Sequence, residues 1–174
     1  MSSPEGSTVT FRGVKASALR SRIRHFARIL QTEVTKGRAF DCLITTDAEL
    51  RRLNRTFRRK NSATDVLSFP STPRPLRPGP RPPTPDPRLL APGPRRLAPG
   101  PSLGDLAISY HRARAQAREL GHTTEQEICV LMLHGVLHLT GLDHETDGGR
   151  MARTETRYRR RLGLPCGLIE RESA

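Results

Sequence analysis

Hydrophobic and polar positions follow two different periods along this chain. Where apolar residues recur every three or four positions, the spacing predicts an amphipathic helix. Five stretches fit this pattern: 16–36, 47–57, 110–120, 124–139 and 149–162. The fourth is apolar nearly all round, which predicts a buried central helix. Thr124 and Glu127 have the spacing of a capping box and mark its expected start.

Shorter stretches predict strands. They are rich in β-branched and aromatic residues and lie at 9–11, 40–45, 64–69 and 104–109. Pro70 closes the third of them, because proline has no N–H to donate to a strand ladder. The pattern therefore predicts four short strands interspersed among five helices.

One long stretch fits neither period. Residues 70–101 hold 13 of the 15 prolines and six arginines, with too few apolar residues to build a core. A small repeat, L-A-P-G-P, begins at Leu90 and again at Leu97. The composition predicts an insertion loop at about 71–101, partly polyproline II in conformation. A solvated spacer is the favoured interpretation, and a ligand for an aromatic-lined groove is the alternative.

The strongest candidate for a functional site is residues 134–144, H-G-V-L-H-L-T-G-L-D-H, which contain three histidines. His134 and His138 are one helical turn apart and share a helix face. Gly141 can end the helix in a left-handed conformation, so that the chain turns back and brings His144 to the same point. Three neutral imidazoles around an open position are what a catalytic zinc requires, whereas a structural zinc has four protein ligands. The spacing predicts one zinc per chain.

The same spacing occurs in the metalloprotease pattern H-E-x-x-H-x-x-G-x-x-H, with one difference. The protease glutamate that follows the first histidine is the general base, and Gly135 stands in its place here. The zinc-holding geometry is therefore present without the protease base. Nickel or copper would also accept three imidazoles, so zinc rests on the ligand type.

Charge and composition narrow the partners and the compartment. The 174 residues carry a formal net charge of +13, with a sequence pI of about 11.3, which favours a polyanion such as nucleic acid or an anionic membrane; a solvated basic surface is the alternative. Three scattered cysteines without a C-x-x-C pair indicate a reducing compartment. No signal peptide and no apolar run near 18 residues is present. We expect a cytoplasmic protein without a membrane partner.

Three segments resemble the YbeY family of zinc-dependent endoribonucleases, which act in ribosomal RNA maturation. Residues 134–144 fit that family's H-G-x-L-H-L-x-G-x-D-H signature at every specified position. Residues 53–70 (L-N-R-T-F-R-R-K-N-S-A-T-D-V-L-S-F-P) and 103–109 (L-G-D-L-A-I-S) look like its second and third blocks. The chain departs from the pattern in its long proline-rich segment, in Ala63 where a proline is common, and in Arg59 where a glycine is common.

The resemblance implies a single α+β domain over residues 1–174, interrupted by the insertion. Its fold would be a small mixed β-sheet packed by helices, with the zinc at one end of a cleft. It also implies single-stranded RNA as the substrate, namely a ribosomal RNA precursor, with the small ribosomal subunit and assembly factors as partners and a role in ribosome quality control. DNA is not expected. The family's zinc ligands carry over to His134, His138 and His144, and its functional arginine to Arg58.

Each of these residues has a chemical role in phosphodiester cleavage. Zinc on three histidines lowers the pKa of bound water to about 7 and polarises a phosphoryl oxygen. Arg58 offers phosphate a planar, permanently charged fork; as a residue in a basic run, it would otherwise be a solvated surface arginine. Asp143 either orients an imidazole or caps the turn after Gly141. The general base stays unassigned, with other acids nearby in the motifs at Asp65, Asp105 and Glu145.

Two other functions remain open at the level of sequence. The first is a zinc metallopeptidase-like hydrolase, which the glycine at position 135 and the charge of +13 disfavour. The second is a non-catalytic ribosome-assembly factor whose zinc is structural. An open zinc position favours catalysis over this second alternative.

Overall fold

A four-stranded mixed sheet forms the centre of the fold. The structure is a computed structural model that describes residues 6–71 and 102–172. The sheet order is β1 (Thr8–Phe11), β2 (Asp41–Thr45), β4 (Gly104–Ser109) and β3 (Val66–Pro70). The first three strands are parallel, and β3 pairs antiparallel with β4 at one edge. The predicted α+β fold with a small mixed sheet is confirmed.

The predicted helices are present, with adjusted ends. They are α1 (Arg20–Glu33), α2 (Asp47–Arg58), α3 (Tyr110–Leu120), α4 (Thr124–Leu139) and α5 (Arg150–Arg161). The first helix begins later than predicted because Ser17–Leu19 forms a separate 3-10 turn, η1. A further short helix, α6 (Leu168–Glu172), follows; five residues are too few to show a helical period in the sequence.

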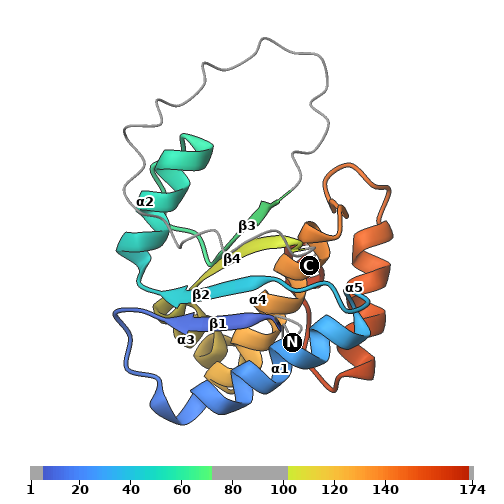
Figure 1. Cartoon of the computed structure of the whole chain (residues 1–174), viewed down its shortest axis with the longest axis horizontal. Coiled ribbons are helices and arrows are strands. Elements are labelled where there is room, and N and C mark those ends of the chain that lie inside the picture. The colour runs from blue at the N-terminus through green and yellow to red at the C-terminus, as the bar shows by residue number, and fades with distance from the viewer. Residues whose placement is uncertain (1–5, 72–101, 173–174) are drawn as a thin grey trace, which may run out of the picture.

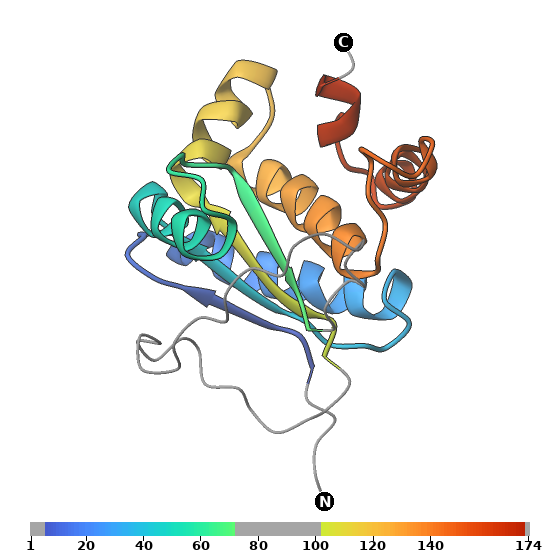
Figure 2. The ribbon, with the colours of Figure 1, turned by 90° about the horizontal axis from the view of Figure 1, so that it is seen from above.

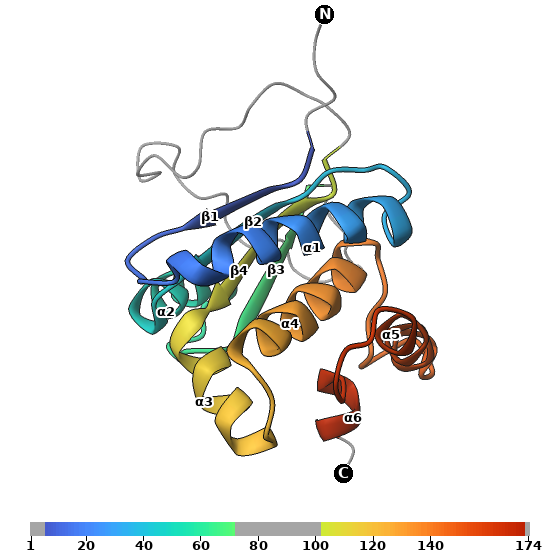
Figure 3. The same cartoon turned by 90° about the horizontal axis from the view of Figure 1, so that it is seen from below.

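The helices cover both faces of the sheet, as Figures 1, 2 and 3 show: α1 and α4 lie on one face and α2 on the other. Strand alternation explains this division. In β4, Leu106 and Ile108 belong to the main core beneath α1 and α4. Ala107, between them, points to the opposite face and joins Leu50 and Leu67 in a smaller cluster under α2.

The central helix α4 is buried along nearly its whole length, as its apolar sequence predicts. Its start differs from the prediction by one residue. Thr123, and not Thr124, is the N-cap, and Gln126 completes the capping box. Glu127 is fully buried instead, where it accepts hydrogen bonds from Arg171 of α6 at 2.7 and 3.0 Å. This ion pair fastens the C-terminal helix to the start of α4.

The two ends of the predicted insertion meet at the sheet. The backbone N–H of Ser71 donates to the carbonyl of Leu103 at 3.0 Å, and its hydroxyl donates to the carbonyl of Ser102 at 2.5 Å. These two hydrogen bonds join the chain just before the insertion to the chain just after it. Residues 72–101, which make up nearly all of the insertion, lie outside the described residues.

Removal of residues 74–97 is expected to leave the thermal unfolding midpoint nearly unchanged. The composition of this segment cannot build a packed core, and its two ends already meet. Shortening the loop lowers its closure entropy, which is worth a gain of about 1 kcal/mol at most. Differential scanning calorimetry of the two chains measures the effect. A large loss of stability on deletion would show that the insertion packs on the fold.

Candidate metal centre

Helix α4 supplies two of the three motif histidines in a rigid setting. His134 is 4% exposed and His138 is half-buried, one turn further along the same face. The helix ends at Leu139, with Thr140 as its C-cap, and Gly141 follows with φ of +96°. The predicted glycine stop is confirmed, because this backbone conformation favours a residue without a Cβ.

A tight loop after α4 returns His144 to the helix face. The N–H of Leu142 donates to the carbonyl of Leu137 at 3.2 Å, which folds the chain back on the helix end. The carboxylate of Asp143 accepts from the N–H of Glu145 at 3.3 Å and from the hydroxyl of Thr146 at 3.0 Å. These bonds fix the turn on which His144 sits. They are the contacts of the turn-capping role, one of the two options that the sequence left for Asp143.

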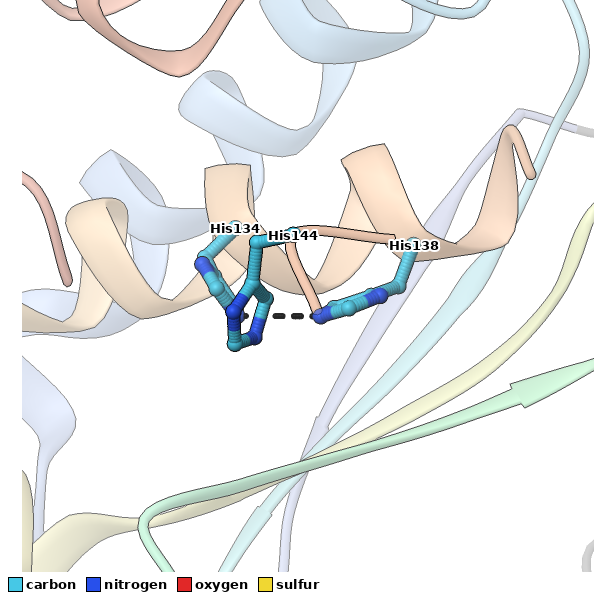
Figure 4. A group of neighbouring side chains, drawn as sticks. All are labelled: His134, His138 and His144. Carbon is cyan, nitrogen blue, oxygen red and sulfur yellow. Dashed lines mark hydrogen bonds between the residues drawn. The ribbon is translucent and has the colours of Figure 1, made fainter. Parts of the chain in front are cut away.

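The three imidazoles converge on one point, as Figure 4 shows. One nitrogen from each ring lies within 4.8 Å of the other two. The ring centroids of His134 and His138 are 4.8 Å apart. The centroid of His144 lies 5.4 Å from that of His134 and 5.3 Å from that of His138. Residues from one helix and the following loop therefore present three nitrogen donors that could hold a metal ion.

Contacts at Nδ1 orient two of the imidazoles. His138 donates from Nδ1 to the carbonyl of Leu142 at 3.1 Å, and His134 Nδ1 faces the carboxylate of Glu155 at 3.4 Å. These contacts leave the Nε2 atom of each ring turned toward the other, 3.1 Å apart. A cation placed between the two rings could bind both Nε2 atoms through their lone pairs.

Burial keeps His138 in the form that binds metals. Burial, followed by the charges that His134 and His144 would carry, lowers the pKa of His138 to about 4; the Leu142 carbonyl and Asp143 oppose this shift. The imidazole is therefore neutral at pH 7. Metal binding requires a deprotonated nitrogen, so no proton has to be displaced from His138 at this pH.

Glu155 of α5 contacts a motif histidine, and sequence reasoning missed it. The residue is 2% exposed, with one carboxylate oxygen facing His134 and the other accepting from the N–H of Leu168 at 2.8 Å. A carboxylate behind an imidazole fixes its tautomer and orientation and raises its basicity. In the sequence, Glu155 is a single acid in a strongly basic helix, 21 positions after His134, and no motif marks it.

Gly135 explains why the protease glutamate is absent. A Cβ at this position would lie 2.7 Å from a side-chain carbon of Leu106, and 3.3 Å from both Ser68 Oγ and Val66. The hydroxyl of Ser68 also donates to the carbonyl of Gly135 at 3.2 Å. The helix packs directly on β3 and β4 here, so a glutamate side chain has no room. The geometry argues against a peptidase mechanism.

The structure places Arg58 apart from the histidines. It is exposed at the last residue of α2, and Arg59 follows as the C-cap in the left-handed conformation, with φ of +56°. Figures 2 and 3 show the edge strand β3 between α2 and α4. Within the described parts of the chain, no hydrogen bond or ion pair joins Arg58 to a motif histidine.

Comparison with known proteins decides the family. A family model described as Endoribonuclease YbeY matches residues 8–163. Endoribonuclease YbeY of Solibacter usitatus is 60% identical over 171 residues, which is 98% of each chain. The chain belongs to the YbeY endoribonuclease family.

Two further similar proteins share less of the sequence. The protein named Endoribonuclease YbeY in Koribacter versatilis is 44% identical over 129 residues, which cover 74% of this chain and 68% of that one. The solution structure of TM1509 from Thermotoga maritima has a TM-score of 0.52 and 22% identity, over 87% of this chain and 86% of that one. This last likeness shows a shared fold.

Across residues 6–71 and 102–172, no helix combines the length and the apolar character needed to cross a bilayer.

The net charge of +13 left two polyanions open as partners, nucleic acid and an anionic membrane. Membership of the YbeY endoribonuclease family favours nucleic acid.

Proposed function

We propose that this chain is a zinc-dependent endoribonuclease that cleaves single-stranded RNA during ribosomal RNA maturation and ribosome quality control. The convergence of three histidine nitrogens from α4 and the following loop carries the proposal. We further propose that residues 1–174 form one domain, interrupted at about 71–101, and that the protein acts in the cytoplasm. A ribosomal RNA precursor is the proposed substrate, with the small ribosomal subunit and its assembly factors as partners.

His134, His138 and His144 fit a zinc ion by donor type and spacing. Tetrahedral zinc with Zn–N bonds of about 2.0–2.1 Å needs ligand nitrogens roughly 3.3 Å apart. The Nε2 atoms of His134 and His138, 3.1 Å apart, come close to this value. Three ligands leave a fourth position for water or substrate. When bound, the zinc supplies Lewis acidity toward a phosphoryl oxygen and a water of lowered pKa.

The chain's own residues divide the remaining work. Glu155 holds the His134 ring, and the Leu142 carbonyl holds the His138 ring, so both point inward before any metal arrives. Arg58 is proposed as the group that binds phosphate, because a guanidinium donates two parallel hydrogen bonds to one phosphate. The net charge of +13 attracts RNA to this surface.

A comparison of substrates tests the proposal. Purified full-length protein should cleave single-stranded RNA and leave casein intact, and chelation should abolish the RNA cleavage. Cleavage of casein alone would indicate a peptidase. Tight binding to small-subunit particles without cleavage, at full zinc occupancy, would indicate an assembly factor with a structural zinc.

Replacement of Glu155 by glutamine is expected to weaken zinc binding about 10- to 100-fold, the usual cost of losing a carboxylate behind a metal-binding histidine. The amide keeps an oxygen for the N–H of Leu168, but loses the negative charge behind His134. Competition with a chromophoric chelator measures the affinity.

Glu145→Gln is the matched control, because Glu145 is an exposed acid beside His144. It makes the same chemical change one residue from a ligand, and its zinc affinity should stay within about twofold of the parent protein. Equal losses in both variants would mean that net charge, and not the orientation of His134, sets the affinity.

A further inference from the structure

Phe57 is an exposed aromatic side chain near the end of α2. With Leu50 and Leu53 it forms the apolar stripe of this helix, at positions i, i+3 and i+7. Leu50 is fully buried, Leu53 is half-buried and Phe57 is 57% exposed. The sheet therefore covers the start of this apolar stripe but leaves its last residue, Phe57, largely exposed. Among the described residues, Leu120 is the one other large apolar side chain with comparable exposure, at 46%.

The ring of Phe57 is held in place by Phe69. The two rings meet edge to face, with centroids 5.2 Å apart and planes inclined by 61°. Phe69 is half-buried in β3 and packs against the small core under α2. An edge-to-face contact positions the Phe57 ring without covering both of its faces. An exposed and fixed aromatic face is a surface on which a flat partner can stack.

Basic residues flank Phe57 in the sequence. Arg55, Arg58, Arg59 and Lys60 are all exposed, and none makes an ion pair with another residue in the ranges that the structure describes. A partner that lies on Phe57 therefore meets a basic segment of the chain. Single-stranded nucleic acid combines a flat aromatic base with a phosphate at every position, and proteins bind it with aromatic platforms set among cations.

The edge strand β3 connects this surface to the metal centre. Ser68 bonds to Gly135, which follows His134, while the next residue, Phe69, contacts Phe57. Successive residues of one strand point to opposite faces, so the two surfaces lie back to back across β3. The outer edge of β3 has no partner strand in the described sheet. A strand of RNA crossing this edge would reach both surfaces.

We infer that Phe57 is a stacking platform for an unpaired base of the RNA, next to the phosphate held by Arg58. The inference rests on the proposed function and adds a binding subsite to it. It explains why a chain with only 4% aromatic residues places a phenylalanine in solvent, in a segment rich in arginine. Any base can stack on such a ring, so Phe57 contributes affinity for unpaired RNA and no sequence preference.

Phe57→Trp tests the stacking directly, because the chain contains no tryptophan and the variant gains a single fluorophore. Its fluorescence should be quenched when a short single-stranded RNA binds, read by stopped flow before cleavage. An RNA of equal length with abasic sites should bind without this quenching. Leu120→Trp is the matched control at the other exposed apolar position and should show no quenching with either RNA.

Affinity gives a second readout. Phe57→Leu keeps apolar bulk against Phe69 but lacks a flat ring, and should weaken binding about 5- to 150-fold, the range for one stacked base. The slope of log affinity against log salt should not change, because no phosphate contact is lost. Arg55→Ala should instead make that slope shallower.

The outcomes separate the inference from the proposed function. If the parent protein neither binds nor cleaves single-stranded RNA, the proposed function fails. If it does both, and Phe57→Trp is not quenched while Phe57→Leu binds as tightly, only the stacking inference fails. A Phe57→Leu variant that keeps its RNA affinity but no longer binds small-subunit particles would overturn the inference in favour of a protein contact.

Discussion

Replacement of His138 by alanine is expected to lower the zinc content from about one ion per chain to near zero and to abolish RNA cleavage. His138 provides one of three nitrogens within 4.8 Å of one another, and its Nε2 lies 3.1 Å from that of His134. Two imidazoles alone leave the ion half-coordinated. His134→Ala and His144→Ala should behave alike. Elemental analysis and a fluorescent RNA substrate measure the two effects.

The loss of zinc should also lower the unfolding midpoint of the His138→Ala protein. A metal that binds the folded protein but not the unfolded chain stabilises the folded protein. The metal site lies on the buried helix α4. His111→Ala is the control, because His111 is an exposed histidine on α3, away from the cluster. It should keep zinc, stability and activity. Full zinc occupancy in His138→Ala would contradict the assignment of the ligands.

Arg58→Glu is expected to reduce cleavage of single-stranded RNA about 100- to 1000-fold, the usual cost of removing one group that stabilises charge in a transition state. Zinc content and folding should be unchanged, because Arg58 is exposed at the end of α2 and touches no motif histidine. Arg58→Lys should lose less, since it keeps the charge but not the planar fork. Steady-state kinetics and zinc analysis of each variant make the measurement.

Arg59→Glu separates a specific role of Arg58 from bulk electrostatics. Arg59 is equally exposed and adjacent in sequence, so it makes the same change in net charge. It should raise KM while leaving kcat nearly intact. Equal losses in both glutamate variants, each restored by higher RNA concentration, would reduce Arg58 to one member of a general basic surface.

Local features of this fold were predictable from the sequence, and contacts between distant elements were not. The histidine cluster was predictable because a helical turn, a glycine stop and a short loop determine its geometry within eleven residues. Glu155 reaches His134 only because α5 packs beside the end of α4, and its neighbours in the sequence suggest a solvated basic helix.

The difference between local and distant contacts also explains why the predicted N-cap of α4 was wrong by one residue. Thr123 and Thr124 both resemble an N-cap, with Gln126 and Glu127 three positions on, so spacing alone fits two registers of the helix. In the structure Thr123 is the N-cap. Glu127 lies on the buried side of the helix, where Arg171 and His122 contact it. The absence of a glutamate at position 135 was visible in the sequence. Its cause, the close approach of Leu106, required the packed structure.

Zinc content measured together with ribonuclease activity tests the central claim most directly. Full-length protein is assayed as purified, after exhaustive chelation, and after zinc is restored. We predict about one zinc per chain and RNA cleavage at the start, neither after chelation, and recovery of both in parallel. Cleavage that persists in protein from which the zinc has been removed would contradict the claim that the three histidines form the catalytic metal centre.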